Sequence, residues 1–259
     1  MKKIAILNFK GGVGKTTTSV NLGDALHLLG KKVLVVDIDA QRNTTLILDK
    51  DKEAGREGGT LYDAITSTPL QEPDVYEHTK GLDFIAGDTR LSNIESALAN
   101  IKAVKEYLLK RVISNLEHNY DYVLFDCPPN NGLMTTMALS AADSLIIPID
   151  SQVMALDGLS DITSTYSQVV ENGLNDNLAI EGFLMTRYRA TLTTAKTVYN
   201  TLRDMFPGKV FNAKIRENTT VGQAPGARMT IFEYDNKCAG AEDYMQLAKE
   251  LIKKKIIFM

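Results

Sequence analysis

Short apolar runs alternate along this chain with longer segments whose apolar residues recur at helical spacing. Runs typical of buried parallel strands lie at residues 4–7, 32–36, 82–86, 122–126, 144–149, 179–185 and 209–215. Segments with helical spacing lie at residues 19–29, 61–65, 91–98, 104–117, 155–170, 192–205 and 240–254. The alternation predicts an α/β fold: a doubly wound, mostly parallel sheet with helices on both faces, in a single domain over residues 1–259.

Two further patterns complete the prediction from periodicity. Residues 48–60 are rich in glycine and charged residues and show no periodicity, which predicts a loop. We find no internal repeat and no linker.

A glycine-rich segment follows the first apolar run and precedes the first helical segment. Its sequence is Lys10-Gly11-Gly12-Val13-Gly14-Lys15-Thr16-Thr17. Glycines let the backbone turn tightly and direct its N–H groups at an anion, and the helix N-terminus adds partial positive charge. In such a phosphate-binding loop, Lys15 contacts the β- and γ-phosphates and the Thr16 hydroxyl binds Mg²⁺.

Carboxylates follow two of the predicted strands directly. Asp37 and Asp39 follow the strand at 32–36, and Asp126 ends the strand at 122–126. Ligands bind at the carboxyl edge of open α/β sheets, so these side chains are expected near the phosphate-binding loop. Asp126 fits the Walker B carboxylate, which holds Mg²⁺, usually through a water. For Asp39 a structural alternative stays open, namely the N-cap of a helix.

Composition and charge narrow the class of protein. Hydrophobic residues make up 44% and charged residues 24%, which is typical of a soluble globular protein. No apolar run approaches the ~20 residues that span a membrane, and the chain enters a strand at once, so we expect neither a signal peptide nor a helix-turn-helix before the loop. Two distant cysteines and three scattered histidines lack metal-ligand spacing. We expect a cytoplasmic protein.

The net charge of −3 is unevenly distributed. Residues 187–259 carry 13 Lys/Arg and 7 Asp/Glu, a net of +6, whereas residues 1–186 have a net of −9. The basic C-terminal part indicates a polyanionic partner, with chance segregation of solvated charges as the alternative.

The glycine-rich loop departs from the usual P-loop pattern in an informative way. Phe9 stands where the first glycine is expected, and Lys10 is an additional lysine. This loop resembles the deviant Walker A motif of the ParA/MinD family of P-loop ATPases. Residues 37–45 resemble that family's second signature, with Ala40 and Arg42 in place of its Pro and Gly. Asp126-Cys127-Pro128-Pro129 and residues 155–159 resemble family segments too.

The resemblance implies a role for each matching residue. ATP is the implied nucleotide, bound by residues 10–17, with Mg²⁺ held by Thr16, Asp37 and Asp126. Lys10 is implied to cross a dimer interface to the partner's nucleotide, where it does the work of an arginine finger. Asp39 is implied to position the attacking water, so Lys10, Lys15 and Asp39 are the catalytic candidates. Thr186 and Arg187 match residues that approach the adenine base.

The ParA/Soj-type partition ATPases are the subgroup that the motifs favour. This resemblance implies slow, Mg²⁺-dependent ATP hydrolysis and an ATP-bound sandwich homodimer that binds double-stranded DNA nonspecifically on the nucleoid. Hydrolysis would be stimulated by a ParB-like or other centromere-binding protein. Arg189 and Lys196 are the candidate DNA contacts, although the chain has Arg216-Glu217 where the family usually has Pro-Arg.

Three other functions are compatible with parts of the sequence to different degrees. A MinD-like membrane ATPase gains support from residues 251–259, which combine three lysines with an apolar end, although membrane binding is not the favoured interpretation. A relative of the nitrogenase iron protein is disfavoured, because two distant cysteines offer no cluster site. An ATP-binding switch with negligible turnover would use the same residues.

Overall fold

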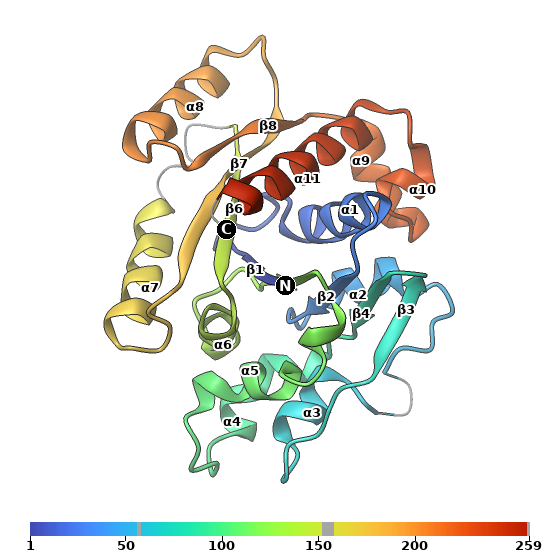
Figure 1. The fold of residues 1–259 in the computed structure, drawn as a ribbon, viewed down its shortest axis with the longest axis vertical. Coiled ribbons are helices and arrows are strands. Elements are labelled where there is room, and N and C mark those ends of the chain that lie inside the picture. The colour runs from blue at the N-terminus through green and yellow to red at the C-terminus, as the bar shows by residue number, and fades with distance from the viewer. Residues whose placement is uncertain (56–57, 152–157, 258–259) are drawn as a thin grey trace.

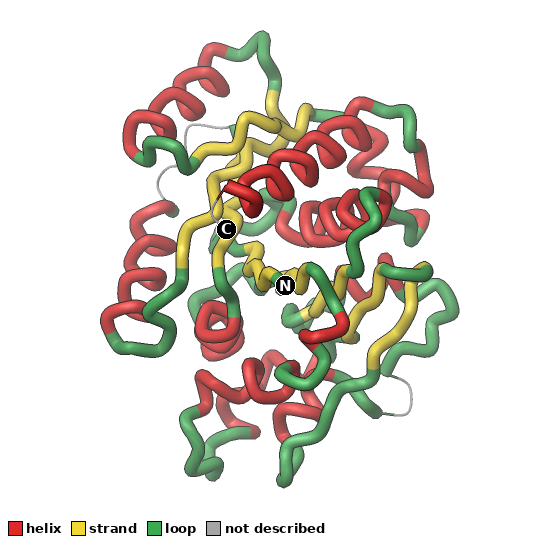
Figure 2. The backbone as a smooth tube through the Cα atoms, viewed as in Figure 1, coloured by secondary structure: helices red, strands yellow, loops and turns green. Residues whose placement is uncertain are grey.

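In the computed structural model, which describes residues 1–55, 58–151 and 158–257, eight strands form one sheet. Their order is β3-β4-β2-β5-β1-β6-β7-β8, and all neighbouring pairs are parallel except β3 with β4. The strands are β1 Lys2–Ile6, β2 Val33–Asp37, β3 Val75–Thr79, β4 Leu82–Ile85, β5 Tyr122–Asp126, β6 Ser144–Asp150, β7 Ala179–Tyr188 and β8 Val210–Arg216. Figure 2 shows these strands running through the centre of the molecule between helices. The predicted α/β class and mostly parallel sheet are confirmed.

Helices cover both faces of this sheet (Figure 1). One face carries α1 Lys15–Leu28, α2 Asn43–Leu48, α10 Ile231–Asp235 and α11 Ala239–Ile257. The other face carries α3 Leu61–Thr66, α4 Ile94–Ala97, α5 Leu108–Ile113, α6 Leu133–Ala141, α7 Leu159–Glu171 and α8 Thr193–Met205. A short helix, α9 Thr219–Gln223, follows β8.

Successive side chains of each strand point to opposite faces of the sheet, and this produces two separate hydrophobic cores. Ile4 and Ile6 of β1 pack with α1 and α11, whereas Ala5 packs on the opposite face with α6 and its neighbours. Because successive strand side chains point to opposite faces, a strand covered on both sides is apolar throughout. This explains the continuous apolar runs in the sequence.

The C-terminal helix belongs to the core over its described length. Tyr244, Leu247 and Leu251 of α11 are fully buried against β8 and α1. The Lys254 ammonium lies 4.0 Å from the centre of the Phe211 ring. Within the described residues, no helix combines the length and apolarity that crossing a membrane requires.

Several element predictions need correction. The helix expected at 104–117 is α-helical only over Leu108–Ile113, with short 3-10 turns on either side. Strand β3 and helices α2, α6, α9 and α10 were not predicted. They are short or, like β3, alternate only weakly, so tertiary packing rather than local pattern determines them. The predicted helix at 155–170 is α7 from Leu159 onward, and residues 155–157 lie outside the described part.

Candidate nucleotide-binding site

The glycine-rich loop connects β1 to α1 at the carboxyl edge of the sheet. Gly12 and Gly14 have φ of +73° and +89°, a left-handed conformation that favours glycine. Thr186, near the end of β7, donates its hydroxyl to the Val13 carbonyl at 2.9 Å. Arg187 donates from Nη2 to the Gly12 carbonyl at 2.6 Å and lies 3.4 Å from Asp150. Strand β7 therefore holds the loop in a defined shape.

Thr186 and Arg187 also line the cavity beside the loop. The hydrogen bonds of their side chains are made to loop carbonyls and, for Arg187, to Asp150. Their contact with an adenine base therefore stays a prediction, whereas support of the loop is visible in the structure.

Lys15 is the first residue of α1 and is buried. Its Nζ donates to the Lys10 carbonyl at 3.2 Å, across the mouth of the loop. Burial lowers the Lys15 pKa, while the nearby Asp126 carboxylate opposes that shift. Lys10, in contrast, is exposed.

Asp37 and Asp126 stand directly opposite each other on the adjacent strands β2 and β5. Both are fully buried. Asp126 accepts hydrogen bonds from the hydroxyls of Thr16 at 2.8 Å, Ser19 at 2.9 Å and Thr44 at 2.8 Å. Asp37 accepts bonds from the Thr45 N–H at 2.8 Å and the Thr45 hydroxyl at 2.7 Å. A Cβ on Gly87 would lie 2.9 Å from the Asp37 carboxyl carbon, so this position requires glycine.

The two carboxylates repel each other in a dry environment. Burial and the neighbouring Asp126 raise the Asp37 pKa to about 7, and burial also raises the pKa of Asp126. A divalent cation would relieve this repulsion. Mg²⁺ typically takes one or two carboxylates together with phosphate oxygens and waters, and the Thr16 hydroxyl on Asp126 is a further oxygen ligand at the same point. The donor set therefore fits Mg²⁺.

This fit depends on a nucleotide to complete the coordination shell. Within the described ranges, no group of three or more His, Cys, Asp or Glu side chains is arranged to hold a metal ion alone. A site that needs phosphate oxygens is the arrangement expected when metal and nucleotide bind together.

Asp39 lies two residues beyond the end of β2 and is nearly buried. Its Oδ1 accepts the Gln41 N–H at 2.9 Å. Helix α2 begins at Asn43 with Arg42 at the N-cap position, so the alternative role of Asp39 as a helix cap is wrong. Asp39 lines both the cavity beside the loop and a neighbouring cavity of about 530 Å³.

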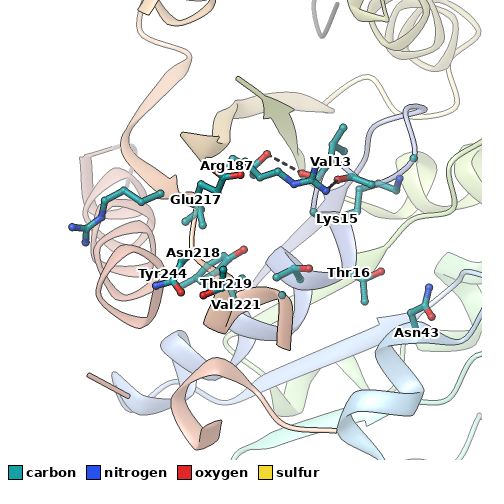
Figure 3. A pocket seen from close by; sticks show the side chains of 18 of the residues that line it. Val13, Lys15, Thr16, Asn43, Arg187, Glu217, Asn218, Thr219, Val221 and Tyr244 are labelled. Carbon is teal, nitrogen blue, oxygen red and sulfur yellow. Dashed lines mark hydrogen bonds between the residues drawn. The ribbon is translucent and has the colours of Figure 1, made fainter. Parts of the chain in front are cut away.

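The main cavity measures about 750 Å³ and extends from the loop to the segment that follows β8. Figure 3 shows Lys15 and Thr16 on one side and Asn218, Thr219 and Val221 on the other. Gly11, Gly12, Val13, Gly14 and Thr17 also line it, as does Tyr244 of α11. Its size suits a small-molecule ligand such as a nucleotide.

The two candidate DNA-contacting residues are placed differently. Arg189 lines the rim of the cavity and forms an ion pair with Glu217. Lys196 is exposed on α8. Arg189 therefore borders the same cavity as Lys15 and Asp39, whereas Lys196 is not among the residues that line it.

Sequence reasoning missed the hydroxyls that hold the two carboxylates, on Ser19, Thr44 and Thr45. A signal was available for Ser19, because it lies one helical turn after Thr16 and so shares its face of α1. Thr44 and Thr45 directly follow the second motif, but only the three-dimensional fold turns them back onto Asp126 and Asp37.

The chain is similar to known proteins over nearly its whole length. Residues 1–180 match a family model described as an AAA domain. The chain is 40% identical to the sporulation initiation inhibitor protein Soj of Bacillus subtilis, covering 96% of this chain and 98% of Soj. It is 37% identical to the chromosome partitioning protein ParA of Caulobacter vibrioides, covering 98% and 95%. The chain belongs to the Soj/ParA family of P-loop ATPases.

A solved structure has a fold similar to that of this chain. Cobyrinic acid a,c-diamide synthase from Mycobacterium smegmatis, with a bound ATP analog and magnesium, matches with a TM-score of 0.82. The two chains are 28% identical, and the match covers 98% of this Soj/ParA-family chain and 95% of the synthase. That enzyme shares the P-loop fold, so fold alone does not define what a chain of this kind acts on.

The buried carboxylate pair generates a prediction on stability. Because the Asp37 pKa is raised from its usual 3.8 to about 7, the folded metal-free chain binds more protons than the unfolded chain over this range. Its free energy of unfolding should therefore fall as pH rises from about 4 to about 7. Asp126→Asn removes one of the two charges, so its stability should depend less on pH, as measured by urea denaturation in EDTA.

The same variant tests the metal site. Asp126→Asn should lose the Mg²⁺-dependent part of the thermal stabilisation by ADP, whereas Asp161→Asn, an exposed change on α7, should keep it. Full Mg²⁺-dependent stabilisation in Asp126→Asn would contradict the assignment of this carboxylate.

Proposed function

We propose that this chain is an ATP-dependent DNA-partition ATPase of the cytoplasm that associates with the nucleoid. Two copies would enclose Mg²⁺ and ATP, bind double-stranded DNA without sequence preference, and release it after slow hydrolysis stimulated by a ParB-like or other centromere-binding partner. The observation that carries the proposal is the near full-length likeness to Soj and ParA. The P-loop with its additional Lys10 supports it.

In this proposal the residues at the carboxyl edge of the sheet bind the nucleotide. Residues 10–17 would hold the phosphates, with Lys15 exchanging its bond to the Lys10 carbonyl for a phosphate oxygen. Thr16, Asp37 and Asp126 would hold Mg²⁺, which when bound neutralises phosphate charge. Asp39 would orient the attacking water. Its position at the junction of two cavities supports this role, because a water could reach the phosphates from there.

Lys10 is the residue proposed to act across the dimer. Its backbone is held on both sides, because the Asn8 side chain accepts its N–H at 2.9 Å and its carbonyl accepts Lys15. Lys10 is exposed to solvent. A fixed backbone with an exposed cation suits a group that acts on a second copy of the chain.

The proposed DNA surface lies on α8 and the adjacent edge strand β8. Lys196 and Arg203 are exposed on α8, and the Lys214 ammonium lies 4.0 Å from the centre of the Tyr199 ring. Arg216 is occupied in a different way, since Asp243 and Glu242 of α11 bind its guanidinium. Exposed cations without such carboxylate partners are suited to phosphate contacts, which carry no sequence information.

The first prediction of this proposal separates the two lysines of the loop. Lys15→Ala should lose ATP binding, because the residue serves its own nucleotide. Lys10→Ala should keep ATP binding but lose ATP-dependent dimerisation and hydrolysis, as measured by calorimetry, light scattering and phosphate release. Lys10→Ala that dimerises with wild-type affinity would disprove action in trans.

A second prediction concerns Asp39. A carboxylate that orients water acts in the transition state more than in nucleotide binding. Asp39→Ala should therefore bind ATP and dimerise, yet hydrolyse it at least about 100-fold more slowly. The dimer should then persist in ATP when followed by size-exclusion chromatography. Normal turnover in this variant would remove Asp39 from the catalytic set.

A third prediction concerns DNA. The ATP-bound chain should bind duplexes of arbitrary sequence, and Lys196→Gln should flatten the slope of log affinity against log salt by about one unit. Lys80→Gln provides the matched control, because Lys80 is exposed in the turn between β3 and β4 at the opposite edge of the sheet. Binding that ignores the nucleotide, or binding to anionic vesicles without DNA binding, would favour the MinD-like alternative.

A further inference from the structure

Arg189 and Glu217 form an ion pair between the ends of the two outermost parallel strands. Arg189 directly follows β7, and Glu217 directly follows β8. The Glu217 N–H also donates to the Tyr188 carbonyl at 3.2 Å, which keeps the two strand ends together beyond the sheet. Both side chains lie on the rim of the nucleotide cavity, and Figure 3 shows Glu217 near Asn218 on the side facing Arg187.

The neighbouring arginines are held more firmly than Arg189. Arg187 is bound to the Gly12 carbonyl and to the buried Asp150. Arg216 makes a two-oxygen contact with Asp243, with Nε at 2.9 and 3.0 Å, and a further bond to Glu242. The carboxylate paired with Arg189 is Glu217, and the two side chains are 56% and 41% exposed. A pair as exposed as this one opens easily in water.

We propose that Glu217 is a built-in competitor for Arg189, and that a DNA phosphate displaces it when DNA binds. This inference rests on the proposed DNA binding. Arg189 borders α8, whose exposed Lys196 belongs to the proposed DNA surface, so a duplex on α8 brings phosphates close to Arg189. Glu217 opposes that contact because it occupies the guanidinium.

The size of the effect follows from the exposure of the pair. An exposed ion pair changes an equilibrium by up to about fivefold, so Glu217→Gln should bind DNA up to about fivefold more tightly at low salt. Because Arg189 contacts a phosphate in the wild-type complex and in the Glu217→Gln complex alike, the slope of log affinity against log salt should change little between them. The gain in affinity requires Arg189.

The test uses the full chain saturated with a non-hydrolysable ATP analogue and a fluorescent duplex of arbitrary sequence. Anisotropy over a series of salt concentrations compares wild type, Glu217→Gln, Arg189→Gln and the double variant. Glu242→Gln is the matched control, because it removes an exposed carboxylate from Arg216. The affinity of each variant for the nucleotide is measured separately, so that saturation is ensured.

The proposal expects Glu217→Gln to strengthen DNA binding, Glu242→Gln to change it little, and the effect of Glu217→Gln to vanish in the Arg189→Gln background. It is overturned if wild type binds DNA and Glu217→Gln does not strengthen that binding. It is also overturned if Glu217→Gln strengthens DNA binding equally in the Arg189→Gln background. That result would show that loss of a negative charge, rather than release of Arg189, causes the tighter binding. Wild-type chain that dimerises with the analogue but binds no DNA in any variant overturns the proposed function itself, and this inference with it.

Discussion

Two carboxylates buried side by side constrain the whole carboxyl edge of the sheet. The parallel register of β2 and β5 places Asp37 opposite Asp126, so the strands that build the core also force two like charges together. Burying such charges without compensation is costly. Hydroxyls from α1 and α2 donate hydrogen bonds to the two carboxylates, and burial raises the pKa of both groups. A cation is the compensation still required. The hydrogen-bonded carboxylate pair can therefore form without a metal ion, and Mg²⁺ binding would stabilise it further.

Helix α2 connects this pair to a distant part of the fold. Its first turn supplies Thr44 and Thr45, which hold the carboxylates, and its last residue offers the Leu48 carbonyl to the His78 ring at 2.8 Å. Beyond the helix, Lys50 pairs with Glu233 of α10, and Glu233 lies 3.3 Å from the other ring nitrogen of His78. This six-residue helix therefore contacts the carboxylate pair through its first turn and His78 through its last residue.

The strength of the sequence signal differed between parts of the chain. Strands covered on both faces are apolar throughout, so their runs identified most of the sheet, and residues 10–17 identified the loop because phosphate binding restricts which residues fit there. The edge strand β3 mixes half-buried residues with the exposed Glu77 and the buried His78, so it lacks a continuous apolar run and could not be found this way. Arg42 stands where the family has glycine and adopts a φ of +58°, a left-handed conformation that favours glycine.

Contacts that depend on long-range register were beyond sequence reasoning. Arg216 looked like one more cation of a basic surface, but the strand places it against Asp243 and Glu242, where it serves the fold. Arg189 meets Glu217 only because β7 and β8 end side by side. The number of Lys and Arg residues in the C-terminal part therefore overstates the number of unpaired cations there, because Arg189 and Arg216 are paired with carboxylates of the same part of the chain.

The buried residues of the site and the exposed residues around it differ in how specifically they indicate a function. Cobyrinic acid a,c-diamide synthase shares this fold over nearly the whole chain, so the fold that carries the loop is not specific to one activity. Residues that distinguish one activity from another must lie where a second molecule arrives. In this chain the residues that we propose for such contacts are Lys10, the exposed residues of α8 and the Arg189–Glu217 pair beside it. A cation facing solvent has no structural need to be there, whereas the buried carboxylates and the hydroxyls around them require one another.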